Sequence, residues 1–154
     1  MMFPSVAWFD ALGEAMETDR ATHERVGEID TTCIWSVFDA PEGDFHVRLA
    51  FEEYSLCSVV EVTDDFDADD VDPDDVAFVL EADFEDWREM IEHLALEGKP
   101  DREHTLNYLS LPGTPFRCWS PDPLGRDMFF RFNQSLQVFV NASARLDTTF
   151  PQTV

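Results

Sequence analysis

The sequence predicts an α+β fold: one mostly antiparallel or mixed sheet of about five strands, flanked by helices, with a carboxy-terminal amphipathic lid helix. Three observations support this prediction. Apolar residues recur at helical spacing at both ends of the chain, residues 29–62 alternate with a period of two, and the predicted elements follow the order α, βββ, β, αα, β, α. A length of 154 residues fits one domain, which we expect to span residues 1–154.

The amino-terminal segment has the pattern of a capped amphipathic helix. Ser5 stands where an N-cap is expected, and Gly27 stands where the helix is expected to stop. Between them, apolar side chains at helical spacing predict a face that packs on a core: Phe9, Leu12 and Met16.

Three strands are predicted next. Residues 33–38 and 45–52 alternate and are joined by a turn at 39–44 that contains Pro and Gly, which indicates a β-hairpin. The run 54–62 extends the hairpin into a meander. Its expected apolar face consists of Leu56, Ser58, Val60 and Val62.

The second half of the chain alternates short strands with helices. Residues 76–80 are wholly apolar, as in a strand covered on both faces, and a helix capped by Asp83 follows and ends at Gly98. A short helix from 100 to 112 and a strand at 116–119 come next. The last predicted helix runs without a break from Leu124 to about Leu146 and carries a stripe of large apolar side chains.

The charge balance is the most unusual feature of the composition. Thirty-three acidic residues stand against ten basic ones, giving a formal charge of -23. Such a chain is best suited to molar salt, where the Debye length is about 3 Å, so we expect the high-salt cytoplasm of a halophile. The scarcity of Lys and Arg argues against nucleic acid and anionic membranes as partners. We also expect no secretory signal and no stable membrane insertion.

Residues 63–75 hold eight aspartates and superficially resemble a calcium loop. The match fails because Asp70 occupies the position that requires glycine, and Val76 the position of the bidentate glutamate. We therefore interpret 63–75 as an acidic, solvated surface loop.

No catalytic or metal-binding motif is evident. The four histidines show no metal-ligand spacing, and the three cysteines, which lack a CxxC pair, are expected to be buried free thiols. We expect no catalytic residues, no metal and no cofactor. The residues concerned are His23, His46, His93, His104, Cys33, Cys57 and Cys118.

The order of elements resembles the sterol carrier protein 2-like (SCP-2) lipid-transfer family over most of residues 5–146. The strand and helix of 76–87 begin the match with an acidic helix start before Trp87. The helix stop at 96–98, the restart at 100–101, the strand at 116–119 and the closing helix continue it. Residues 111–123 depart from the family pattern, with Asp122 as the one counterpart of its acidic residue.

The resemblance implies a non-enzymatic carrier with an apolar tunnel between sheet and helices for a fatty-acyl, isoprenoid or other lipid. Helical phase and the implied fold give its lining as Trp35, Trp87, Ile91, Phe129, Phe132, Leu136 and Phe139. Three alternatives stay open from the residues alone. The rings can simply fill a core, the chain can be a homodimeric or accessory interaction module without a ligand, or it can be a small enzyme with a hydrophobic substrate.

Overall fold

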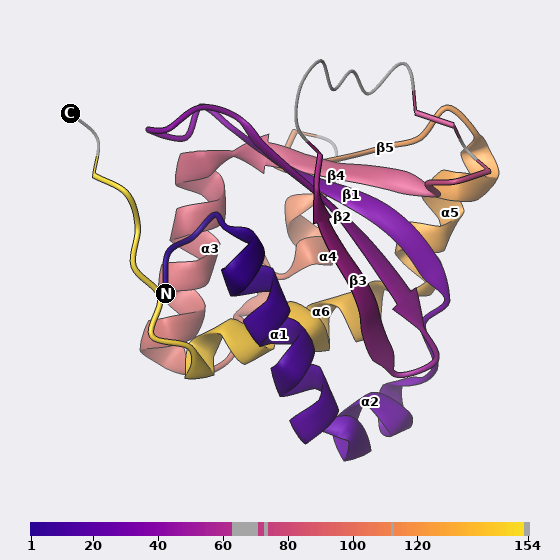
Figure 1. Ribbon diagram of the computed structural model, residues 1–154, viewed down its shortest axis with the longest axis horizontal. Helices are drawn as coiled ribbons and strands as arrows, with labels where there is room; N and C mark the ends of the chain where they lie inside the picture. Colours follow the sequence, from indigo (N-terminus) through magenta and orange to yellow (C-terminus); the bar gives the residue numbers. More distant parts are fainter. Residues whose placement is uncertain (63–70, 73, 112, 153–154) are drawn as a thin grey trace.

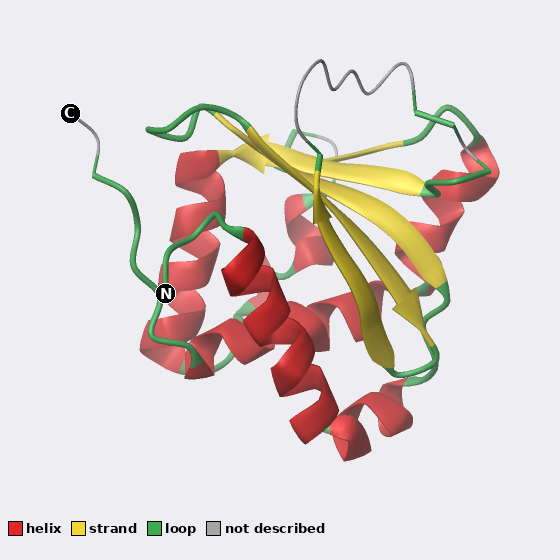
Figure 2. Cartoon of the chain, viewed as in Figure 1, coloured by secondary structure: helices red, strands yellow, loops and turns green. Residues whose placement is uncertain are grey.

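The computed structural model describes residues 1–62, 71–72, 74–111 and 113–152. One five-stranded sheet is covered by helices that gather on one of its sides (Figures 1 and 2). The predicted α+β class is therefore confirmed. The acidic loop 63–75 lies mostly outside the described residues, so it stays a prediction.

The sheet is mixed, with the strand order β3-β2-β1-β4-β5. The first three strands pair antiparallel, β4 lies parallel to β1, and β5 returns antiparallel along β4. Strand β1 therefore lies at the centre, where both neighbours cover its edges. The strands are β1 (Thr31–Phe38), β2 (Phe45–Glu52), β3 (Ser55–Glu61), β4 (Phe78–Asp83) and β5 (Arg117–Trp119).

The helices follow the predicted positions, with two breaks that the sequence analysis did not predict. The first helix is capped by Ser5 as expected, but Asp19 divides it in two before Gly27 ends it. The helical segments are α1 (Val6–Thr18), α2 (Arg20–Val26), α3 (Phe84–Glu97), η2 (Arg102–His104), α4 (Leu106–Leu109), α5 (Pro123–Arg131), α6 (Asn133–Asn141) and η3 (Ala142–Arg145).

The prediction of one continuous helix from Leu124 to about Leu146 is wrong. Phe132, with φ -101° and ψ 13°, interrupts it, so α5 and α6 point in different directions. The break lets α5 pack on β4 and β5 while α6 packs against α1, α2 and α4 (Figure 1). One straight helix could not reach both sets of partners.

Strand β3 also departs from its predicted face. The register with β2 shifts between Ala50 and Phe51, and Cys57 is left without a partner in the register. This bulge exchanges the core-facing and solvent-facing positions in the rest of the strand. Val59 packs on the core, whereas Val60 is 52% exposed. The three cysteines are free as predicted. Cys33 is also buried as predicted, but Cys118 is half-buried and the bulge residue Cys57 is exposed.

The core lies between the sheet and the helices, and a smaller cluster covers the opposite face of the central strands. On β4, Val79 belongs to the smaller cluster and Leu80 to the main core, and both are fully buried. A strand covered on both faces, as the apolar run 76–80 predicted, is therefore confirmed.

Gly125 allows α5 to lie directly on β4. A Cβ atom at this position would overlap the carbonyl oxygen of Ala77 and Oγ of Ser120. We expect Gly125→Ala to lower the free energy of unfolding by about 2–3 kcal/mol, because backbone has to move to remove the overlap. Urea unfolding in molar KCl measures this loss.

Gly13 provides the matched control, since it also lies in a helix against a strand. A Cβ there would meet Cδ2 of Leu56, a flexible side chain, at 3.1 Å. Gly13→Ala should therefore be close to neutral, because a gain in helix propensity of about 1 kcal/mol offsets the tight contact. Equal losses in the two variants would contradict this account of Gly125.

Candidate functional site

Three of the seven predicted ligand residues meet at the centre of the core, although they come from three different elements. Trp35 of β1 and Trp87 of α3 stack with ring centroids 5.3 Å apart. Phe139 of α6 meets Trp35 edge-on at 5.8 Å and Phe51 of β2 at 5.1 Å. We call Trp35, Trp87, Phe139 and Phe51 the ring cluster. It joins the sheet to the helical layer.

The other four predicted residues lie in the same core, on α3, on α5, on α6 and at the break between α5 and α6. Phe129 of α5 packs on Phe78 of β4, with ring centroids 5.5 Å apart. All seven are buried, the most exposed being Phe132 at 9%. The set consists of Trp35, Trp87, Ile91, Phe129, Phe132, Leu136 and Phe139. Their role as a tunnel lining stays a prediction.

The two indole N–H groups of the ring cluster differ in their partners. Nε1 of Trp87 donates to the carbonyl oxygen of Ser36 at 3.0 Å. Nε1 of Trp35 is buried without an oxygen or nitrogen acceptor among the described residues, and the weakly polar Cys33 thiol interacts with it. A buried donor without a good acceptor costs about 1–3 kcal/mol, so this N–H retains the capacity to bind a polar group.

A groove of about 750 Å³ lies at the break between α5 and α6. Phe132, at the break itself, is the predicted ligand residue that borders it. The wall includes residues from the end of α2 and from the turn that leads to β1. Most of the other lining groups are polar or charged, among them Glu28, Asp30, Arg131 and Asn133. The groove therefore connects solvent with the edge of the apolar core.

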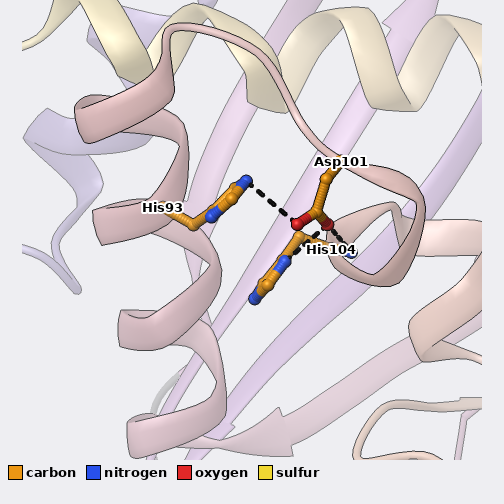
Figure 3. A group of neighbouring side chains, drawn as sticks. All are labelled: His93, Asp101 and His104. Atoms are coloured by element: carbon orange, nitrogen blue, oxygen red, sulfur yellow. Dashed lines mark hydrogen bonds and ion pairs between the residues drawn. The ribbon is translucent and has the colours of Figure 1, made fainter.

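A second cluster, at the end of α3, brings together two histidines and an aspartate (Figure 3). The rings of His93 and His104 stack with centroids 4.0 Å apart and an interplanar angle of 7°. Oδ1 of Asp101 lies 2.6 Å from Nδ1 of His104, and Oδ2 of Asp101 lies 3.6 Å from Nε2 of His93. We call His93, Asp101 and His104 the histidine cluster. Nitrogen and carboxylate donors of this kind can hold a metal ion.

Local structure explains why these three side chains meet. Gly98 ends α3 in the left-handed conformation, with φ 76°, and turns the chain back toward the helix. Asp101 then caps η2, accepting from the backbone N–H groups of Glu103 and His104. Ligand spacing within one helix does not relate His93 to His104, because the two stand on either side of the Gly98 turn. The signal available was a histidine near a glycine stop, followed by Asp-x-x-His.

Hydrogen bonds perturb the ionisation of the cluster. Burial alone lowers the pKa of His104, but hydrogen bonds to Asp101 and Glu89 outweigh it, so the pKa lies above its ordinary value. The hydrogen bond from His104 in turn holds the pKa of Asp101 below its usual range. Each group therefore stabilises the charged form of the other.

His23 is a buried histidine outside both clusters, and its Nδ1 has no hydrogen-bond partner among the described residues. Burial lowers its pKa, although the charges of Asp19 and Glu17 oppose the shift. Above the ordinary histidine pKa of about 6.5 it is neutral in both folded and unfolded chains. Below that value the unfolded chain binds the proton first, so this residue makes stability fall as pH falls.

His23→Leu should remove this part of the pH dependence. We expect wild type to lose more free energy of unfolding than the variant between neutral and mildly acidic pH, because the other groups titrate alike in both proteins. Urea unfolding of both at each pH gives the difference. An identical loss in the two proteins would show that His23 ionises equally in folded and unfolded chains.

The fold and the ring cluster place this chain among small α+β proteins that pack helices over one face of a mixed sheet around an aromatic core. Comparison with solved structures gives the particular fold. A conserved hypothetical protein of Thermus thermophilus, described as possibly a sterol carrier protein, aligns with a TM-score of 0.63 and 15% identity, covering 96% of this chain and 91% of its own. Sterol carrier protein 2 aligns with a TM-score of 0.60 and 17% identity, covering 91% and 95%. The chain has an SCP-2-like fold.

Two sequence comparisons gave no such likeness. No family model matches the sequence, and no curated protein gives a significant match. In the described part of the chain, no helix combines the length and apolarity needed to cross a membrane.

Proposed function

We propose that this protein is a non-enzymatic carrier that binds a hydrophobic small molecule, such as a fatty-acyl, isoprenoid or other lipid chain, between its sheet and its helices. The likeness to sterol carrier protein 2 over nearly the whole chain carries the proposal. Trp35, Trp87 and Phe139 come from three elements and pack ring against ring in this structure, so the ligand would have to part them.

The apolar part of the ligand would lie against the ring cluster and the side chains of Ile91 and Leu136. Its polar end would accept a hydrogen bond from Nε1 of Trp35, which lacks an oxygen or nitrogen acceptor among the described residues. Removing a 16-carbon chain from water contributes on the order of 10 kcal/mol before ordering costs. This gain is large enough to offset separation of some packed rings.

We propose that the ligand enters at the groove between α5 and α6. The two helices meet at Phe132, whose backbone is not helical, and α6 has no side-chain cap at its amino end. These features favour movement of α6 away from the sheet while α5 stays packed on β4. Phe132, at the edge of the groove, would be the first core ring to move.

Native mass spectrometry of protein purified without detergent tests the proposal, together with titration of a fluorescent fatty acid in molar KCl. We expect a co-purifying lipid or saturable binding with one probe per chain. Probe binding should quench the fluorescence of Trp35 and Trp87, which Trp35→Phe and Trp87→Phe assign individually. Absence of both a co-purifying lipid and saturable binding of fatty-acyl and isoprenoid probes would overturn the proposal.

The alternative is a homodimeric interaction module without a ligand. Two large apolar side chains of α5 favour it, since Leu124 is 69% exposed and Phe130 44% exposed. Sedimentation velocity in molar KCl separates the two proposals. A dimer that Leu124→Glu or Phe130→Glu dissociates would support the interaction module, and a strict monomer would remove it.

The charge of -23 supports a high-salt cytoplasm as the place of action. The acidic surface repels anionic membranes. We therefore propose that the carrier exchanges its ligand through brief contacts with a membrane and does not insert stably.

A further inference from the structure

The histidine cluster lies at the junction of α3 and η2 and plays no part in the proposed carrier function. We propose that His93, Asp101 and His104 bind one divalent transition-metal ion of the Zn²⁺ class, with water in the remaining coordination position. The three donors come from the last turns of α3, from the N-cap of η2 and from the end of η2. An ion here would join the helix to the segment that follows it.

The distances suit a single ion. One ligand atom from each residue lies within 4.8 Å of the other two. Zn²⁺ binds nitrogen and oxygen at about 2.0–2.2 Å, so its ligands are about 3–4 Å apart. Nε2 of His93 and Oδ2 of Asp101, at 3.6 Å, already have this spacing. The two imidazole rings have to turn out of their parallel stack, because each nitrogen lone pair lies in its own ring plane and both must point at the ion. Nδ1 of His104 also moves away from Asp101, since the ion takes the place of its proton.

The donors are held in place by neighbouring groups. Oδ1 of Asp101 accepts from the backbone N–H of Glu103 and of His104 at 3.0 Å each, which fixes the carboxylate. Nε2 of His104 lies 3.3 Å from Oε1 of Glu89. A carboxylate on the far nitrogen of a metal-binding imidazole fixes its tautomer and orientation, and this is the usual arrangement around bound metals.

His93 supplies an independent indication. Its Nε2 is buried and makes no hydrogen bond among the described residues, and at 3.6 Å Asp101 Oδ2 lies beyond hydrogen-bonding distance. A buried imidazole nitrogen that faces a carboxylate and a second imidazole is suited to share an ion with them. Binding an ion would also give this nitrogen the partner that it lacks.

The donor set and its surroundings favour a transition metal over Mg²⁺ or Ca²⁺. Two imidazoles suit Zn²⁺, Co²⁺ and Ni²⁺, whereas the hard cations prefer oxygen ligands alone. A groove of about 600 Å³ beside the cluster gives the ion access to solvent.

The test is titration of EDTA-treated full-length protein with Zn²⁺, followed by a chromophoric chelator, in molar KCl with excess Mg²⁺. We expect one equivalent of Zn²⁺ bound, a rise in melting temperature on binding, and a visible absorption band from Co²⁺ in the same site. His93→Gln and His104→Gln should each weaken Zn²⁺ binding by at least about tenfold, and Glu89→Gln by about tenfold.

Two matched controls separate this site from the acidic surface. Glu85→Gln removes a carboxylate of the same groove, one turn of α3 before Glu89. His46→Gln removes a histidine on β2. Neither change should alter the affinity for Zn²⁺. Circular dichroism establishes that each variant folds. Zn²⁺ binding that excess Mg²⁺ abolishes, or that is equal in wild type, His93→Gln and His104→Gln, would overturn the proposal by assigning the ions to scattered carboxylates.

Discussion

Moving the protein from molar to millimolar KCl should lower its melting temperature by about 10 °C or more. The Debye length grows from about 3 Å in molar salt to about 30 Å in about 10 mM salt, so acidic groups across the whole surface repel one another. The unfolded chain relieves this repulsion by expanding. For a domain of this size, a shift of about 10 °C corresponds to a loss of roughly 3–5 kcal/mol.

Ion pairs of the described residues offset little of this charge. The pairs of Arg20 with Glu24 and of Arg88 with Glu92 lie on exposed helix surfaces, with side-chain exposures between 38% and 52%. Such exposed pairs add little to stability, because water and salt screen the attraction. Salt also weakens them, but the sum of repulsions among 33 acidic residues is the larger effect.

Thermal unfolding followed by circular dichroism across KCl concentrations measures the shift. Sucrose at equal osmolality should not restore the melting temperature reached in KCl, because sucrose does not screen charge. The triple variant Asp10→Asn, Glu14→Gln, Glu17→Gln, on exposed positions of α1, should show a smaller salt dependence than wild type. A melting temperature that is unchanged or rises on removal of KCl would contradict the electrostatic interpretation of the composition.

Local sequence patterns predicted the elements that depend on a few neighbouring residues. Ser5 caps α1, and its Oγ accepts from the N–H of Trp8, as the amino-terminal pattern indicated. The alternation of 33–38 and 45–52 gave the hairpin of β1 and β2. These elements were predictable because their caps, turns and periodicity depend on residues that are close together in the sequence.

The features that the sequence did not predict depend on contacts between distant segments. The apolar stripe alone does not predict that Phe132 interrupts the helix. The break follows from the different partners of the two halves, since α5 packs on β4 and β5 whereas α6 packs against α1, α2 and α4. The bulge at Cys57 likewise follows from pairing with β2. His93 and His104 meet because a glycine turn reverses the chain, so no ligand spacing within α3 could indicate them.

Phe139→Ala should lower the free energy of unfolding by about 3–5 kcal/mol, because the side chain is almost fully buried and contacts Trp35 and Phe51 edge-on. Urea unfolding in molar KCl measures the loss. The variant leaves a cavity beside Trp35, at the centre of the proposed ligand site. Since a ligand then displaces one ring fewer, the variant should bind the fluorescent fatty acid more tightly than wild type.

Phe84→Ala is the matched control for this second effect. Phe84 is also 1% exposed, but it packs against Phe3 and Phe150, outside the predicted ligand residues. Its removal should cost a similar free energy of unfolding and leave probe affinity unchanged. If Phe139→Ala proves too unstable to fold, Phe139→Leu tests the same position with a smaller cavity. An equal gain in probe binding for both positions would indicate that any loosened core takes up the probe, and the ring cluster would then have no special role as a binding site.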